Sequence, residues 1–192
     1  MNALSMLVRR SWAIKLARVG IFLVFLITLN VATVWADGLI VYGDRWAIMI
    51  VEPRGWVGDC AAGAPDGMNI VFYPKGSSWS EAPVVIYGMV LDIKPAEVNR
   101  QRQEDRRLNE EHYGKQINWR DIEISRPYNV GQVYAAAEMY ANAYEKMVWI
   151  GDEASNVVVL FVLNARGGKK PQKDIIDLFD AVIRSVVLMQ KK

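Results

Sequence analysis

Residues 157–163 read VVVLFVL, an unbroken run of apolar side chains in the last third of the chain. β-Branched and aromatic residues in a run of this length favour a strand over a helix. A strand with one face in water alternates apolar and polar residues, whereas a continuous apolar run is typical of a strand buried on both faces. We therefore expect a central strand here, in a sheet that carries other structure on both sides.

The segments next to this run predict a hairpin and a helix. Residues 146–150 (KMVWI) are apolar, and a turn-like Gly-Asp-Glu-Ala-Ser sequence at 151–155 joins them to the central strand. Residues 171–188 carry apolar side chains at a spacing of about 3.6 residues, which predicts a helix that packs on the sheet. The members of this stripe are Ile175, Leu178, Phe179, Val182, Ile183 and Val186.

Three more strands are predicted upstream, at residues 45–51, 68–73 and 83–91. Residues 55–67 contain four glycines, a proline and two aspartates, so they are interpreted as a loop. The polar segment 95–113 predicts a helix that shows most of its circumference to water. It begins with a proline, which suits a first helical turn, and a glycine follows its last residue.

Two segments between the helices are harder to assign. Residues 117–125 (INWRDIEIS) alternate imperfectly and are expected to form a strand. Residues 133–140 (VYAAAEMY) contain three alanines, which favour a helix, but their aromatic flanks and the strands that follow favour a strand. The order predicts an α+β domain: one antiparallel sheet of six to seven strands flanked by two helices.

The first 36 residues have the composition of an export signal. They contain Arg9, Arg10, Lys15 and Arg18 without an acidic residue, then the apolar stretch 19–29, and then small residues at 34 and 36. This pattern is typical of a secretory signal peptide with a cleavage site, which we place after Ala36. The predicted organisation is a signal peptide at 1–36 and one domain at 37–192, in the periplasm or secreted.

An uncleaved membrane anchor is the alternative interpretation of the same segment. Residues 19–36 would form a helix of roughly 27 Å, close to the thickness of the hydrocarbon core of a bilayer. The basic residues would then stay in the cytoplasm, and the domain would face the periplasm. Both interpretations place residue 37 and everything after it outside the cytoplasm.

Composition excludes several classes of function. Removing residues 1–36 takes four cations and no anions from the chain, which leaves 19 Lys and Arg against 21 Asp and Glu. A nucleic-acid-binding surface needs a concentrated excess of cations, so no nucleic-acid partner is expected. The chain has a single cysteine and a single histidine, which cannot supply a zinc site. No metal or other cofactor is predicted.

The chain resembles the PsbP/Mog1-like fold group of small α/β/α-sandwich proteins. The resemblance rests on three segments, the predicted final helix and the order of strands. The segments are Glu52-Pro53-Arg54-Gly55-Trp56, Asn69-Ile70-Val71-Phe72-Tyr73-Pro74 and the run from Val157 to Arg166. The group includes photosystem accessory proteins, nuclear-transport factors and bacterial envelope lipoproteins. The resemblance therefore implies an accessory role through binding, although a shared fold does not transfer function.

Cys60 and His112 are the one pair of residues that suggests nucleophilic catalysis. A cysteine nucleophile needs a base that generates its thiolate. Cys60 follows Gly58-Asp59 in the predicted loop, and His112 lies near the end of the polar helix. The sequence motifs that surround known catalytic cysteines are missing, so an idle thiol and a solvated imidazole are the simpler interpretation.

The segment 166–170 (RGGKK) has the composition of an anion-binding turn. Arg166, Lys169 and Lys170 surround two glycines and lead directly into the predicted final helix, whose first amides lack partners. An ordinary strand-to-helix turn with solvated cations explains the same residues. The segment supports a second hypothesis, that the domain carries a small ligand or anion.

Aromatic residues near the loops suggest a surface for a protein partner. Trp56 and Trp79 lie in or beside the segments 53–67 and 74–82, which we expect at one end of the sheet. Aromatic anchors dominate protein interfaces, but they also dominate ordinary cores. We predict an exported, non-catalytic accessory protein that binds an envelope protein or small ligand, with Trp56, Asp59, Cys60 and Trp79 as contacts.

Overall fold

The structure, a computed structural model, describes residues 38–114, 117–123 and 131–190. The chain divides after Trp35 into two units, and the described residues all belong to the second unit. The predicted signal peptide at 1–36 lies outside these residues. In the part of the chain that is described, no helix has the length and apolar character needed to cross a membrane.

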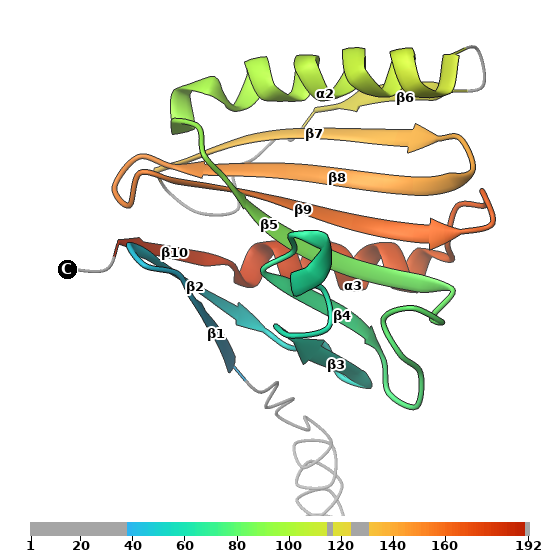
Figure 1. Cartoon of the computed structure of the whole chain (residues 1–192), viewed down its shortest axis with the longest axis horizontal. Coiled ribbons are helices and arrows are strands. Elements are labelled where there is room, and N and C mark those ends of the chain that lie inside the picture. The colour runs from blue at the N-terminus through green and yellow to red at the C-terminus, as the bar shows by residue number, and fades with distance from the viewer. Residues whose placement is uncertain (1–37, 115–116, 124–130, 191–192) are drawn as a thin grey trace, which may run out of the picture. The chain divides into compact units, whose positions relative to one another are not determined.

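Seven antiparallel strands form the larger sheet (Figure 1). Their order is β3-β4-β5-β9-β8-β7-β6. The strands are β3 (Trp56–Asp59), β4 (Ile70–Pro74), β5 (Val84–Leu91), β6 (Asn118–Ile122), β7 (Gln132–Tyr140), β8 (Ala143–Asp152) and β9 (Val157–Arg166). The predicted hairpin is the pair β8 and β9, and the ambiguous segment 133–140 is a strand.

β9 is the central strand that the apolar run predicts. It pairs with β5 on one side and β8 on the other, and residues 157–163 are all buried. Val159 and Phe161 belong to one hydrophobic core, whereas Val158 and Leu160 belong to another on the opposite face of the sheet. The unbroken apolar run therefore exists because both faces of this strand are covered.

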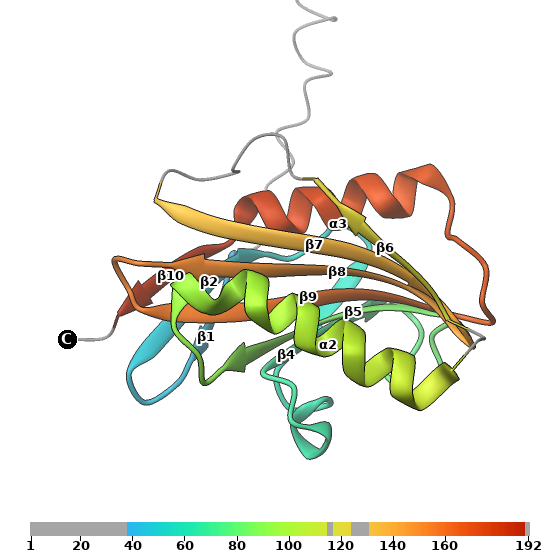
Figure 2. The same ribbon diagram turned by 90° about the horizontal axis from the view of Figure 1, so that it is seen from above.

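Each face of the large sheet carries one helix (Figures 1 and 2). Helix α2 (Val98–Tyr113) follows a short turn of 3-10 helix, η2 (Pro95–Glu97), and Gly114 with φ of 59° ends it. Although α2 is mostly polar, Val98 is buried, and the indole N–H of Trp149 donates to the Asp105 carboxylate at 2.9 Å. Helix α3 (Lys173–Ser185) buries Phe179, Val182 and Ile183 on the other face.

A second sheet packs on the α3 side of the domain. It contains β1 (Gly38–Tyr42), β2 (Trp46–Val51) and β10 (Val187–Gln190), in the order β1-β2-β10 and with antiparallel pairing. Ile48 and Ile50 of β2 are fully buried and share one core with α3 and the large sheet. This core joins both sheets and one helix.

The expectation of a single sheet is therefore wrong in its finer detail, although the α+β class with two helices is correct. Residues 55–67, which were expected to form a loop, contain strand β3. Pairing with β4 holds this segment as a strand despite its glycine-rich composition. The final helix ends at Ser185 instead of Leu188, since Val186 is extended and β10 pairs with β2. Tertiary pairing overrides local propensity at both places.

Candidate functional site

The large sheet separates the two tryptophans of the predicted contact surface. Trp56 is only 5% exposed and belongs to the core on the α3 side, so its side chain is not available to a partner in the folded domain. Trp79 is half-buried on the other face, where its ring meets Tyr87 edge to face at 5.8 Å. The indole N–H of Trp79 donates to the Asp66 carboxylate at 3.3 Å.

Asp59 and Cys60 lie together at the end of β3. The Asp59 carboxylate accepts hydrogen bonds from the backbone N–H groups of Ala62 at 2.9 Å and Ala61 at 2.7 Å, and from the Tyr73 hydroxyl at 3.1 Å. These bonds lower the pKa of Asp59, because they stabilise its charged form. The carboxylate therefore closes the local turn.

The Cys60 thiol is exposed, and its pKa is raised by partial burial of the sulfur and by the Asp59 charge. A catalytic cysteine needs the opposite shift, toward the thiolate. His112 is exposed near the end of α2, with its ring against Tyr113 at 4.6 Å. Within the described residues, no hydrogen bond or ring contact connects His112 to Cys60, so nothing in this geometry supports the dyad.

Two of the three cations in the segment 166–170 have partners inside the domain. The Arg166 guanidinium donates to the backbone carbonyl of Trp79 at 2.9 Å and to that of Ser80. The Lys170 ammonium donates to the Glu138 carboxylate at 2.9 Å. Lys169 is exposed, and no ion pair between described residues includes it. Two of the three cations in this segment therefore bind groups of the domain itself and stabilise the fold.

Glu138 is the buried carboxylate with which Lys170 forms its ion pair. It lies on β7 with only 4% of its surface exposed, and it also accepts hydrogen bonds from Arg120 and, at 3.0 Å, from the Tyr144 hydroxyl. Burial opposes the ionisation of Glu138, but the bonds from Lys170 and Tyr144 outweigh this effect and lower its pKa. Glu138 therefore stays ionised although it is buried.

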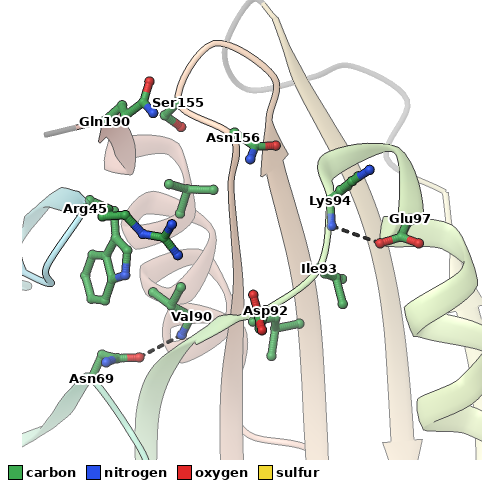
Figure 3. Close-up of a pocket in the computed structure, with 13 residues that line it drawn as sticks. Arg45, Asn69, Val90, Asp92, Ile93, Lys94, Glu97, Ser155, Asn156 and Gln190 are labelled. Carbon is green, nitrogen blue, oxygen red and sulfur yellow. Dashed lines mark hydrogen bonds between the residues drawn. The ribbon is translucent and has the colours of Figure 1, made fainter. Parts of the chain in front are cut away.

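A polar cleft that sequence reasoning did not place lies between the two sheets (Figure 3). Its volume is about 590 Å³. The β1–β2 turn and the end of β10 line it on one side, and the end of β5, the segment before η2, the last residue of η2 and the β8–β9 turn line it on the other. The lining residues are Arg45, Trp46, Asn69, Val90, Leu91, Asp92, Ile93, Lys94, Glu97, Ser155, Asn156, Val157 and Gln190.

Three exposed charged side chains surround this cleft. Arg45, Asp92 and Lys94 are exposed, and among the described residues none of them forms an ion pair. Figure 3 shows them placed with Asn156 around the same opening. Asn156 has a φ of 52°, a left-handed conformation that asparagine tolerates in turns.

Other lining residues hold the walls in place. Asn69 accepts a hydrogen bond from the Val90 N–H at 2.7 Å, which joins the start of β4 to β5. Glu97 accepts from the Lys94 N–H at 3.0 Å and from Arg100 at 2.5 Å, and its pKa is lowered chiefly by the backbone bond. The cleft therefore has structural residues in its walls and, at its opening, three charges that form no ion pair with another described residue.

The architecture has a counterpart among solved structures. The solution structure of cyanobacterial PsbP from Synechocystis is similar with a TM-score of 0.51 and 15% sequence identity, over 79% of this chain and 92% of that chain. This chain has a PsbP-like fold. No family model and no curated protein matches the sequence. At this level of identity the likeness shows the fold alone, and the resemblance stated from the sequence is confirmed to that extent.

In the PsbP-like domain, the three charged residues at the opening of the cleft belong to no recognisable sequence motif. Arg45 follows Gly43-Asp44 in the turn between β1 and β2, and Asp92 and Lys94 flank Ile93 between β5 and η2. Each is a charged residue just outside a strand, which is common on any protein surface. The feature that these residues share in the sequence is their position, since all three lie in connections between secondary-structure elements.

Proposed function

We propose that the PsbP-like domain is an exported accessory protein that acts by binding, and that the polar cleft is its ligand site. The observation that carries this proposal is the set of charged side chains around one opening, Arg45, Asp92 and Lys94, which form no ion pair with another described residue. Exposed charged residues commonly find a partner or lie scattered, whereas clustered charges of both signs in a concave site fix the orientation of a ligand.

The composition of the cleft indicates the class of ligand. Trp46, Val90 and Leu91 are half-buried and Val157 is buried, so the cleft has an apolar component beneath its charged opening. Its charged lining residues are two cations and two carboxylates, Asp92 and Glu97, of which Glu97 is already bound to Arg100. This set complements a molecule with both an acidic and a basic group. A small zwitterion with an apolar side chain, such as an amino acid or a short peptide, fits this description.

A titration followed by two-dimensional NMR tests the proposal. The full chain is titrated with hydrophobic amino acids and dipeptides, and with the matching carboxylic acids and amines, which lack one of the two charges. We expect saturable shifts at the Trp46 indole and at Asn156 with the zwitterions, and weaker binding of the singly charged compounds.

Two variants provide the comparison. Arg45→Ala and Asp92→Ala should weaken the interaction, whereas Lys169→Ala, which removes an exposed cation outside the cleft, should leave it unchanged. Binding to the native state must also raise the melting temperature of the wild-type protein. Shifts that never saturate, or that are equal in the Arg45→Ala and wild-type proteins, would refute a ligand site in the cleft.

A protein partner at the surface around Trp79 is the second candidate. The half-exposed Trp79 ring contacts Tyr87 and donates to Asp66, and Arg166 holds the Trp79 backbone carbonyl, so the ring is positioned before any partner arrives. A preorganised aromatic side chain loses little entropy on binding, which makes it a good anchor. Asp59 and Cys60 are the other exposed or half-exposed contacts proposed for this surface.

Capture from envelope extracts tests this second candidate. Trp79→Ala should reduce recovery of a specific envelope protein, while Leu108→Ala on α2 serves as a control at another exposed apolar position. Equal recovery by the two variants would remove Trp79 as a contact.

A further inference from the structure

The exposed apolar side chains of this domain gather on the small sheet. Among the described residues, six large apolar side chains are substantially exposed, and five of them belong to β1, β2 or β10. These five are Ile40 (42%), Tyr42 (66%), Met49 (38%), Val51 (36%) and Val187 (41%). The sixth, Leu108, lies on α2. A random scatter of exposed apolar residues would not favour one sheet so strongly.

The five side chains share one face of the sheet. Met49 on the middle strand lies directly between Ile40 on β1 and Val187 on β10. The intervening residues of the middle strand, Ile48 and Ile50, are fully buried against the α3 side. Because side chains alternate along a strand, the exposed residues form a plane that faces away from the core. We call this plane the outer apolar face.

The size of the outer apolar face argues against a second copy of the chain as its partner. Its exposed fractions amount to about 450 Å² of side-chain surface, given the usual areas of such residues. A stable protein interface buries roughly 800 Å² on each partner. A dimer through this face alone would therefore fall short, whereas a lipid surface requires no complementary protein shape.

The position of the outer apolar face along the chain favours a lipid surface. One residue, Asp37, separates the segment 19–36 from Gly38, where β1 begins. One extended residue spans about 3.5 Å, so a chain that keeps this segment in a bilayer holds β1 at the membrane surface. Tyr42, the most exposed of the five, belongs to a residue type that is enriched where membrane meets water.

We propose that the outer apolar face lies on the lipid surface in the form of the protein that retains residues 19–36 as an anchor. The apolar side chains then enter the boundary between headgroups and acyl chains, as they do in proteins that lie on a membrane. The proposal rests on the anchored alternative for the N-terminal segment and is independent of the ligand in the cleft.

Site-directed fluorescence on the full-length chain in phosphatidylethanolamine–phosphatidylglycerol vesicles tests this proposal. In a Cys60→Ser background, an environment-sensitive dye is attached at Met49→Cys or, as the matched control, at Leu108→Cys on α2. Nitroxide groups on the lipids should quench the label at residue 49 several-fold more strongly than the label at residue 108. Equal quenching would mean that the anchor alone holds the domain, and would overturn the proposal.

Two further outcomes would also overturn it. Energy transfer between labels at residue 49 that depends on protein concentration and occurs without lipid would assign the face to a second copy. An N-terminus at residue 37 in all protein isolated from cells would remove the anchored form. Val187→Cys labels the same row of the sheet and replaces Met49→Cys if that variant fails to give the wild-type melting temperature.

Discussion

Replacing Lys170 with methionine should weaken the native state through the buried Glu138 carboxylate. The Lys170 ammonium contacts this carboxylate at 2.9 Å, while Arg120 and Tyr144 supply its other hydrogen bonds. Methionine keeps most of the aliphatic length of lysine but removes the donor and the charge. The loss therefore falls mainly on a carboxylate that is 4% exposed.

The expected loss of stability in Lys170→Met follows from the burial of the two partners. A hydrogen bond to a charged group contributes about 1.5–3 kcal/mol, and the 44% exposure of the Lys170 side chain reduces this through solvent screening to about 1–2 kcal/mol. For a domain of this length, each kcal/mol lowers the melting temperature by about 2–4 °C. Urea denaturation at pH 7, followed by circular dichroism, measures the difference directly.

The effect should depend on pH in a defined direction. The native pKa of Glu138 lies below its ordinary value of 4.5, so its contribution to stability is present above that value and is lost as the pH falls through the native pKa. Without Lys170, burial raises the pKa of Glu138 toward the ordinary range and shrinks this contribution. The stability gap between wild type and Lys170→Met should therefore be widest near pH 7 and narrow on acidification.

Lys169→Met is the control, because Lys169 is the exposed neighbour without an ion pair among the described residues. It should change the free energy of unfolding by less than about 0.5 kcal/mol, as surface substitutions usually do. If the two methionine variants are equally stable at pH 7, the ion pair contributes nothing. A gap for Lys170→Met that stays constant as the pH falls would show that its origin is not the carboxylate.

Three further substitutions or reactions test the packing and the loop chemistry. Gly88→Ala should destabilise the domain by about 1–3 kcal/mol in urea denaturation, because the new methyl group would lie 2.6 Å from the buried Phe161 ring; wild-type stability would mean that the ring moves freely. Alkylation of Cys60 by iodoacetamide should be slower at pH 7.5 than that of a small thiol, and it should accelerate above pH 9, since its pKa is raised; a fast reaction at neutral pH would contradict this shift. Trp56→Ala should cost about 3–5 kcal/mol because this side chain is buried, and Trp79→Ala much less; similar melting temperatures for both would mean that Trp56 is not part of the core.

The sequence correctly predicted the elements that have a clear local pattern of apolar residues or clear end signals. Residues 157–163 form the doubly covered strand β9, and α2 lies between the predicted start at Pro95 and end at Gly114. These predictions succeed because apolar periodicity and end signals are local properties. Residues 133–140, for which the sequence left helix and strand both open, form a strand whose alternate side chains reach two different cores.

The division into two sheets was not predictable in this way. A strand pattern states which residues are buried but does not identify the neighbouring strand. β2 resembles any half-buried strand, yet it pairs with β1 and with β10, which the sequence places at the far end of the chain. Residues 186–188 continue the apolar stripe of α3, so only the partner strand determines where the helix ends.

For charged residues too, the sequence did not identify the neighbours in space. Composition marked Arg166 and Lys170 as anion-binding cations, but it could not reveal the backbone carbonyls and the buried Glu138 that occupy them. Conversely, Arg45 and Asp92 belong to no sequence motif, although both lie beside one cleft and form no ion pair within the part of the chain that the structure describes. Whether a charge is available to a ligand depends on its neighbours in space, which a single sequence does not specify.

The position of the cleft has a consequence for how binding would act on the domain. Arg45 belongs to the small sheet, whereas Asp92 and Lys94 follow β5 of the large sheet, and the two sheets have no strand in common. They are joined by side-chain packing around α3 and by connecting segments of the chain. A ligand that contacts both Arg45 and Lys94 would therefore bridge two separately hydrogen-bonded layers. Its binding energy would stabilise their packing, so hydrogen exchange in β1 and β2 should slow when the cleft is filled.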